Sequence, residues 1–445
     1  MTTMKTDLSS KSILVQDNGL FLNFALRMAE PGGFGKVYYV NNWRRGRPSF
    51  NEIAVGKGYD GIEVLKHEWD VMDKVDVIAF PDVLDGDRQV YLRRHGYKVW
   101  GSGKGEELEL YRVFWKKMVA AMGLPVNDYK VIKGISNLRR FLEENEDKFI
   151  KISFMRGLWE SRQHEKYWIS KTHIDRLEYQ LGPLAETTEF LVEEPVETKL
   201  EVAADGMFVT NSEGIGRFLS LSLNGVEIKD SGYVGVVQRT EDMAGPFQMV
   251  SDALQPVLQR YGYANLFACE SRIDGDDQPY PIDPCCRVAS PAGEAQLATW
   301  DNLPEIVYHG AHGQIVDPVA RAPYVAQAMI FNKGDENEWC AVDVPSEVRD
   351  KVKLYYGMRR GKEDWIVPQM NPFDEIGSVV DIGQTAEEAI KKVTAIAKKL
   401  GGDISIKIEA LADAAKAFDL MEQRGMSTEP AENLDGRANS GRVTA

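Results

Sequence analysis

The two residues with the clearest chemical potential are Glu270 and Asp283, which flank an acidic turn. The segments that contain them, Ala268–Ile273 and Pro279–Asp283, read as two strands of a β-hairpin. A pairing symmetric about the turn sets Glu270 opposite Asp283, with Cβ atoms roughly 4.5–5.5 Å apart. Carboxylates at that distance repel unless a cation lies between them, and Mg²⁺ prefers a few carboxylates with water and phosphate oxygens. The spacing predicts a magnesium site, and a solvated acidic hairpin is the alternative.

Two further residues follow on the same side of the second strand. Cys285 lies two residues after Asp283 and Arg287 two residues further, so alternation along a strand directs them to one face. The planar guanidinium of Arg287 matches carboxylate and phosphate oxygens. Cysteine is a poor ligand for Mg²⁺, so the predicted ligand set contains only the two carboxylates.

The elements before this hairpin begin with an alternation of strands and helices. Short apolar runs at 12–17, 36–40, 76–80 and 98–100 read as strands, with helical spacing between them. This order predicts an open parallel α/β sheet, in which ligands bind beyond the carboxyl ends of the strands.

A longer helix is predicted at Glu106–Met122, where Gly123-Leu124-Pro125 ends it. A strand at 126–132, a helix at 137–145 and a strand at 149–153 follow. From about residue 188 to 290 the pattern changes to strands joined by turns, which indicates α+β structure with antiparallel pairing. Amphipathic helices are expected at Thr385–Leu400 and about 408–423.

The predicted organisation has four structured parts and a tail. The tail after 425 is expected to be disordered because its apolar content is low. The parts are an N-terminal α/β domain (1–103), a first subdomain with a lid (104–187), a second subdomain with the metal site (188–310), a small C-terminal α+β domain (311–425) and the tail (426–445).

Composition narrows the function classes. The 445 residues carry a formal net charge of −15 with a pI near 5.1, which disfavours nucleic acid and anionic membranes as partners. The four cysteines form no disulfide or zinc pattern, and no signal peptide or membrane-spanning run is visible. These features favour a cytoplasmic protein, or one in the host cytoplasm if a phage encodes it.

The order of the segments resembles the ATP-grasp ligases, and most closely the phosphoribosylamine–glycine ligases. Glu109–Pro125 looks like the family's opening helix and turn, Phe149–Ser153 like its phosphate-lysine strand, and Asp283–Arg287 like its metal motif. Glu193–Val196 looks like the hinge that receives adenine. The resemblance covers about residues 12–423 at low identity, and ATP-grasp proteins of tailed phages are a weaker analogy.

The resemblance implies a role for each matching residue. Lys151 and Arg112 would bind phosphates, and Glu201 the ribose. Adenine would contact Glu193, Glu194 and Val196. Arg287 would hold acyl-phosphate oxygens, and Lys229 would contact substrate. Glu270 and Asp283 would bind Mg²⁺, or Mn²⁺ in its place.

The implied activity is that of an ADP-forming carboxylate–amine ligase. The protein is expected to be cytoplasmic and to be a monomer or a homodimer. A small-molecule acid would be phosphorylated by ATP, and an amine would displace the phosphate. Phosphoribosylamine with glycine, and hence purine biosynthesis, is the default substrate assignment. A non-catalytic ATP-binding protein and a kinase on the same fold are the alternatives.

The sequence departs from the family at three places. The lid region 154–161 has one glycine, and Arg156 adds a charge there. In the opening helix, Arg112 stands where the family has a lysine. In the metal motif, Cys285 stands where the family has an asparagine. On the substrate side, the family's glycine-rich segments are absent. The segment that replaces one of them contains Lys229 and Asp230. These two residues are either substrate contacts or a salt bridge within a turn.

Overall fold

Five parallel strands form the N-terminal sheet, in the order β3-β2-β1-β4-β5. The computed structural model describes residues 6–41, 55–154, 161–198, 200–229, 231–243, 245–334, 338–368 and 375–439. Every residue of β1 except Ser12 is buried, as expected for a strand covered on both faces. The predicted parallel sheet is confirmed, and β3 is an addition to it. The strands are β1 (Ser12–Asp17), β2 (Lys36–Asn41), β3 (Ile62–Val64), β4 (Val77–Ala79) and β5 (Val99–Trp100). The helices are α1 (Leu22–Met28) and α2 (Gly86–Arg94).

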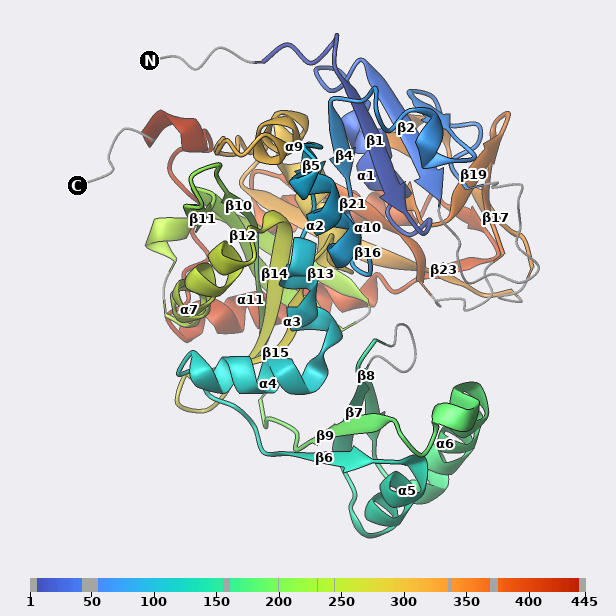
Figure 1. Cartoon of the computed structure of the whole chain (residues 1–445), viewed down its shortest axis with the longest axis vertical. Coiled ribbons are helices and arrows are strands. Elements are labelled where there is room, and N and C mark those ends of the chain that lie inside the picture. Colours follow the sequence, from blue (N-terminus) through green and yellow to red (C-terminus); the bar gives the residue numbers. More distant parts are fainter. Residues whose placement is uncertain are drawn as a thin grey trace.

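The opening helix predicted at Glu106–Met122 is interrupted. The chain forms α3 (Glu107–Leu110) and then α4 (Arg112–Ala121), with Tyr111 between them at φ −105° and ψ 87°. Figure 1 shows the two helices pointing in different directions. No glycine or proline marks this break, so the sequence could not reveal it. Tertiary contacts stabilise it, since the Leu110 carbonyl accepts a hydrogen bond from the Phe154 amide (3.0 Å).

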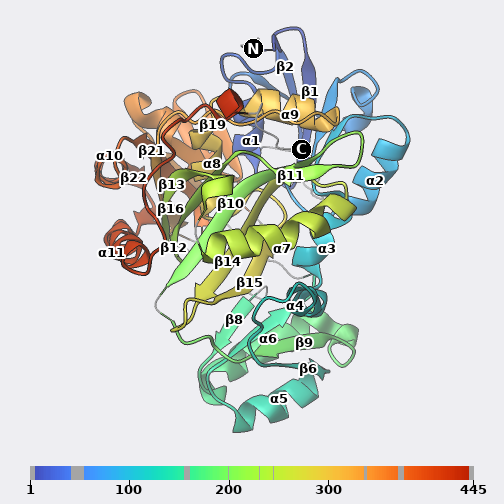
Figure 2. The ribbon, with the colours of Figure 1, turned by 90° about the vertical axis from the view of Figure 1, so that its left-hand side faces the viewer.

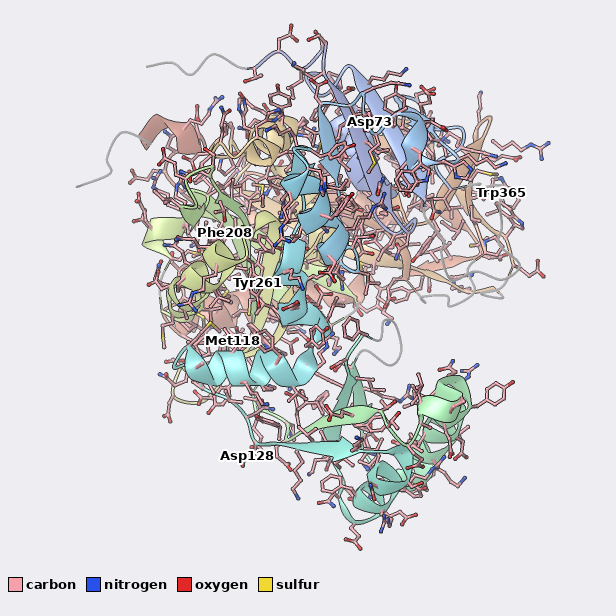
Figure 3. All side chains as sticks on the ribbon, in the orientation of Figure 1. Asp73, Met118, Asp128, Phe208, Tyr261 and Trp365 are labelled. Atoms are coloured by element: carbon pink, nitrogen blue, oxygen red, sulfur yellow. The ribbon has the colours of Figure 1, made fainter. Side chains whose placement is uncertain are left out.

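A small lobe, residues 129–193, projects below α4 in Figures 1 and 2. Its antiparallel sheet has the order β6-β9-β7-β8 and its own apolar core. Ile135, Leu138 and Leu142 recur on one face of α5 and fill that core. Figure 3 labels Met118 on α4 and Asp128 just before β6, which bracket one connection to the lobe. The elements are β6 (Tyr129–Lys133), α5 (Ile135–Glu144), β7 (Lys148–Ile152), β8 (Ser161–His164), α6 (Tyr167–Leu181) and β9 (Glu189–Glu193).

A ten-stranded sheet, with antiparallel pairs throughout, forms the centre of the molecule. Its strand β13 pairs with β16, so strands after residue 310 extend the same sheet. A domain boundary at 310 therefore crosses a continuous sheet. The strands are β10 (Glu201–Thr210), β11 (Gly216–Phe218), β12 (Leu221–Ile228), β13 (Gly232–Arg239), β14 (Ala264–Ile273), β15 (Pro279–Cys285), β16 (Tyr324–Asn332), β18 (Val352–Leu354), β21 (Glu375–Gly383) and β23 (Ile404–Ile406). The helices are α7 (Pro246–Arg260), α8 (Ala292–Thr299), α9 (Leu303–Ala311), α10 (Ala386–Ala397) and α11 (Glu409–Gln423).

An aromatic cluster fixes α4 to this sheet. Phe208, labelled in Figure 3, lies 5.1 Å from Phe218 and 6.3 Å from Tyr263, measured between ring centroids. Trp115 of α4 is 1% exposed and belongs to the same core cluster. The helix that carries Arg112 is therefore anchored to the main body of the molecule.

The C-terminal part adds a four-stranded sheet and an extended segment. The expectation of a disordered tail does not describe residues 427–439, because backbone and side-chain hydrogen bonds hold them. Ala431 donates to the Val237 carbonyl (2.8 Å), and the Leu434 carbonyl accepts from Ala320 (2.8 Å). Such backbone pairing leaves no trace in composition. The small sheet has the order β19-β20-β17-β22, with β17 (Cys340–Asp343), β19 (Gly357–Arg360), β20 (Glu363–Ile366) and β22 (Gly401–Gly402).

None of the described helices combines the length and the apolar character that crossing a membrane requires.

Candidate functional site

The β14–β15 hairpin sets Glu270 directly opposite Asp283, as the sequence predicts. A bulge follows immediately, so Ser271 pairs with Pro281 and the strand beyond is displaced by one residue from the symmetric register. The turn is stabilised by Asp274, whose Oδ1 accepts from the amides of Asp276 and Gln278 at 2.9 Å each. Local turn chemistry and strand alternation thus determine the facing pair.

Asp283 receives two cations from different parts of the chain. Arg112 Nη1 at the start of α4 contacts Oδ1, and Lys151 Nζ on β7 lies 3.2 Å from Oδ2. Lys151 also donates to the Ile282 carbonyl (2.9 Å). The site therefore joins the hairpin of the large sheet to the small lobe and to α4.

The network of ion pairs continues through Glu193, the last residue of β9. Lys151 Nζ lies 3.2 Å from Glu193 Oε2, and Lys116 of α4 contacts Oε1. Lys116 is 1% exposed and also donates to Asn127 Oδ1 (2.6 Å). We call Arg112, Lys116, Lys151, Glu193 and Asp283 the ion cluster.

Lys116 is a site residue that the sequence interpretation missed. It lies four residues after Arg112, so both side chains share one face of α4. The spacing of four residues was the signal in the sequence that Lys116 accompanies Arg112. Other charged residues on the same stretch of chain made this signal hard to distinguish from a solvated helix face. Glu193, predicted to lie at an adenine hinge, has its side-chain carboxylate inside the ion cluster.

The charges of the cluster shift one another's pKa in opposite directions. Burial raises the pKa of Asp283, but Lys151 and Arg112 outweigh it and lower this pKa to about 2. Burial lowers the pKa of Lys151, yet Asp283 and Glu193 leave it raised overall. For Lys116, burial prevails over the attraction of Glu193, and its pKa is lowered. Asp283 and Lys151 are therefore held in their charged forms.

Glu270 differs from Asp283 because no cation in the described part of the chain forms an ion pair with it. Burial, together with the charges of Asp283 and Glu201, raises its pKa well above the usual value. Lys229, exposed just after β12, is the cation that opposes this shift most. A cation placed between the two carboxylates would relieve the repulsion.

The candidate metal ligands are few. Over the described ranges, no group of three or more His, Cys, Asp or Glu side chains is arranged to hold a metal ion. Cys285 forms no disulfide and is only partly buried. Glu270 and Asp283 thus fit a magnesium ion that takes its remaining ligands from water and phosphate oxygens, as Mg²⁺ commonly does.

The segment after β9 is held by Arg272, a second residue that the sequence interpretation missed. Arg272 Nε donates to Glu201 Oε2 (3.0 Å), and its Nη1 donates to the Val196 carbonyl (3.3 Å). The backbone of Glu194 is also occupied, because its amide donates to Asp128 and its carbonyl accepts from Asn127. The Glu194 side chain lies 3.0 Å from Lys148, away from the ion cluster.

Two backbone groups of this segment stay available. The Pro195 carbonyl and the Val196 amide form no hydrogen bond with any described residue. One is an acceptor and the other a donor on neighbouring residues, which suits the edge of a purine base.

Arg287 lies at the end of β15 against the N-terminal sheet. Its Nε donates to Glu109 Oε1 (2.8 Å) and lies 4.0 Å from Asp82 Oδ1. Its guanidinium carbon is 6.0 Å from the ring centre of Phe21. Glu109 Oε2 also accepts from the Cys286 amide (2.7 Å). Arg287 therefore lies beyond the carboxyl ends of β1 and β4, where a ligand of such a sheet is expected.

Arg156 and Asp230, which the sequence singles out near the lid and the substrate side, lie outside the described residues.

A parallel N-terminal sheet, a small antiparallel lobe and a large antiparallel sheet, with paired charges where they meet, define the ATP-grasp fold. No protein-family model and no curated protein matches the sequence. Solved structures do match.

The biotin carboxylase domain of 2-oxoglutarate carboxylase from Hydrogenobacter thermophilus aligns with a TM-score of 0.62 at 12% identity, covering 93% of this chain and 95% of that one. Phosphoribosylamine–glycine ligase from Thermotoga maritima gives 0.61 at 16% identity, with coverages of 89% and 98%. N5-carboxyaminoimidazole ribonucleotide synthetase from the same organism gives 0.57 at 15%, with 88% and 99%. At these identities the likeness establishes the fold, which confirms the predicted fold class.

Proposed function

We propose that this protein is an ATP-dependent carboxylate–amine ligase that forms ADP through an acyl phosphate. The observation that carries the proposal is the ion cluster, which brings Arg112 and Lys151 against Asp283 where the small lobe meets the hairpin. Phosphoryl transfer depends mainly on positioning and on neutralising phosphate charge, and this cluster supplies both. The similar biotin carboxylase structures, one in complex with MgADP and another with β,γ-ATP, support ATP and Mg²⁺ as cofactors here.

The nucleotide would lie between the lobe and the hairpin. The free Val196 amide and Pro195 carbonyl would meet the adenine edge, with Glu193 and Glu194 beside it. Glu201, oriented by Arg272, would accept from ribose hydroxyls. Arg112 and Lys151 would exchange part of their contact with Asp283 for phosphate oxygens.

Glu270 and Asp283 would hold Mg²⁺, or Mn²⁺ in its place, which supplies charge neutralisation at the transferring phosphate. The Glu270 carboxylate, which has no ion pair with a described residue, supports this assignment, since a cation would lower its raised pKa.

In the proposed reaction, a carboxylate oxygen of the acid attacks the γ-phosphorus and ADP leaves. The amine nitrogen then attacks the acyl carbon, and phosphate leaves with the acid's oxygen. Arg287 would hold oxygens of the acyl phosphate, since its guanidinium is anchored by Glu109 and faces the N-terminal sheet. Lys229 would contact the substrate near Glu270.

The substrates are proposed by class as a small acid and an amine, with glycine and phosphoribosylamine as the first pair to test. The similar phosphoribosylamine–glycine ligase supports that pair, and a monomer or homodimer in the cytoplasm is the proposed form.

The test uses the full chain with Mg-ATP and acids labelled with ¹⁸O in the carboxyl group. Panels of acid and amine should release ADP, and the inorganic phosphate should contain one ¹⁸O atom. Glu270→Gln combined with Asp283→Asn should abolish this transfer, whereas Asp276→Asn, in the exposed turn of the same hairpin, should retain it.

Two other outcomes would assign a different function. The soft Cys285 beside Asp283 favours a non-catalytic ATP-binding protein as the second candidate, and ATP binding by calorimetry with no ADP from any panel would establish it. ADP formed with phosphate on a substrate hydroxyl, and no free phosphate, would indicate a kinase.

A further inference from the structure

The hairpin that carries Glu270 and Asp283 has a second strand that is poor in hydrogen-bond donors. This strand, β15, lies at the edge of the ten-stranded sheet, where its partner is β14. Three of its seven residues are prolines, Pro279, Pro281 and Pro284, which have no amide hydrogen to donate. The bulge after Glu270 interrupts the pairing with β14 as well. The geometry of the facing carboxylates therefore depends on contacts from outside the hairpin.

Arg424, the C-cap residue of α11, reaches the turn of this hairpin. Its Nη1 donates to the Ile273 carbonyl (3.4 Å), and its Nη2 donates to the Asp274 carbonyl. Nη2 also lies 2.6 Å from Asp277 Oδ1. Asp277 has a φ of 59°, in the left-handed region that few residues other than glycine adopt. The guanidinium, with its fork of donors, thus holds the turn at its beginning and near its end.

The same turn is joined to the segment after β9. Thr198 Oγ1 donates to the Ile273 carbonyl, and the Ile273 amide donates to the Leu200 carbonyl (3.1 Å). The Ile273 carbonyl therefore accepts from both Thr198 and Arg424. Helix α11 is itself fixed to the large sheet, because most of its buried side chains belong to the main core. An anchored helix thus holds the hairpin where the hairpin meets the segment after β9.

We propose that Arg424 is a positioning residue for the metal pair, which keeps Glu270 opposite Asp283 at a spacing that one divalent cation can bridge. This inference rests on the proposed assignment of Mg²⁺ to the two carboxylates.

Arg424 acts from the turn, through the two strands, and limits the motion of β15 relative to β14. Residues that orient metal ligands commonly change the metal affinity about tenfold or more when they are removed. The loss of Arg424 should therefore weaken the binding of the cation more than the binding of the nucleotide itself.

Isothermal titration of the full chain with ADP tests the proposal, once in EDTA and once with saturating MgCl₂. The ratio of the Kd in EDTA to the Kd with Mg²⁺ measures how much the cation strengthens nucleotide binding. In the wild type this ratio should be well above one. Arg424→Met should reduce the ratio about tenfold and leave the Kd in EDTA within about twofold. Arg424→Lys, which keeps a cation near Asp277, should recover part of the ratio.

Two further variants serve as controls. Lys416→Met removes an exposed charge from the same helix and should leave the ratio unchanged. Asp277→Asn removes the ion pair with Arg424 but leaves the two carbonyl contacts, so it should lower the ratio less than Arg424→Met does. Hydrogen–deuterium exchange of the turn, residues 273–278, should be faster in Arg424→Met without any ligand.

Thermal denaturation of each variant without ligand shows whether it folds, and Asp277→Asn decides the question if Arg424→Met does not fold. A wild-type chain that binds no ADP would contradict the proposed function, and ADP binding that Mg²⁺ does not strengthen would contradict the metal assignment. Either result would overturn the inference as well. A normal wild-type ratio that Arg424→Met leaves unchanged would overturn the role of Arg424 alone. An equal rise of both Kd values would do the same, because it would indicate a general loss of structure.

Discussion

Lys151 and Lys353 are both strand lysines withdrawn from solvent, yet their environments act in opposite directions. Asp283 and Glu193 each lie 3.2 Å from Lys151, and its pKa is raised despite burial. Lys353 forms no ion pair with any carboxylate that the structure describes, and burial lowers its pKa. The comparison shows that the distance to a carboxylate decides whether burial or charge attraction prevails. Nearby carboxylates thus favour the charged form of Lys151 in the ion cluster, whereas burial favours the neutral form of Lys353.

The largest expected effect comes from removing the carboxylate that joins two buried lysines. Glu193→Ala leaves Lys116, 1% exposed, with Asn127 as its one remaining partner among the described residues. We expect the free energy of unfolding to fall by about 3–5 kcal/mol, the usual cost of leaving a buried charge unpaired. Urea denaturation followed by tryptophan fluorescence measures it, because Trp115 lies on α4.

The adjacent Glu194 is the matched control. Its side chain is 48% exposed, and within the described ranges it forms an ion pair with Lys148 alone. Glu194→Ala should change stability by less than about 1 kcal/mol, as is usual for exposed ion pairs. An equal loss in the free energy of unfolding for the two variants would contradict the view that burial makes the ion pairs of the cluster stabilising.

A buried carboxylate near Lys353 should give the next largest effect, through pH. Burial raises the pKa of Glu294 to about 7, because Lys353 and Asn23 only partly compensate for it. The folded protein then binds more protons than the unfolded chain between pH 4.5 and 7, so stability falls as pH rises through this window. Glu294→Gln keeps an acceptor for Asn23 and should add about 3 kcal/mol of stability at pH 8 and little at pH 4.

Urea denaturation across pH 4–8 provides the measurement, with Glu213→Gln, an exposed position, as the control. Parallel pH profiles for wild type and Glu294→Gln would show that Glu294 is charged throughout the window.

A smaller effect is expected on nucleotide affinity. Lys151→Met removes a cation that would contact phosphate, and a hydrogen bond to a charged group contributes about 1.5–3 kcal/mol. The Kd for ATP should therefore rise between about tenfold and a hundredfold in calorimetry. Lys148→Met, on the same strand but paired with Glu194, should leave the Kd within about twofold; an equal rise would remove Lys151 from the nucleotide site.

The sequence could predict what local rules determine. The parallel sheet followed from apolar strands alternating with helices, and the pairing of Glu270 with Asp283 followed from turn residues and strand alternation. The contacts of Lys116 with Glu193 and of Arg272 with Glu201 could not be predicted, because they join elements whose approach depends on packing. The break at Tyr111 and the ordered segment 427–439 depend on tertiary hydrogen bonds for the same reason.

An exposed pair should show the smallest effect and so complete the comparison. Lys416 lies 2.8 Å from Asp413 on α11, with side-chain exposures of 76% and 60%. Water solvates both charges, so pairing gains little over solvation and costs side-chain entropy. Lys416→Gln should change the free energy of unfolding by less than about 0.5 kcal/mol in the same urea assay. A loss near that of Glu193→Ala would mean that charge pairing stabilises this protein irrespective of burial, and the contrast between Lys151 and Lys353 would lose its physical basis.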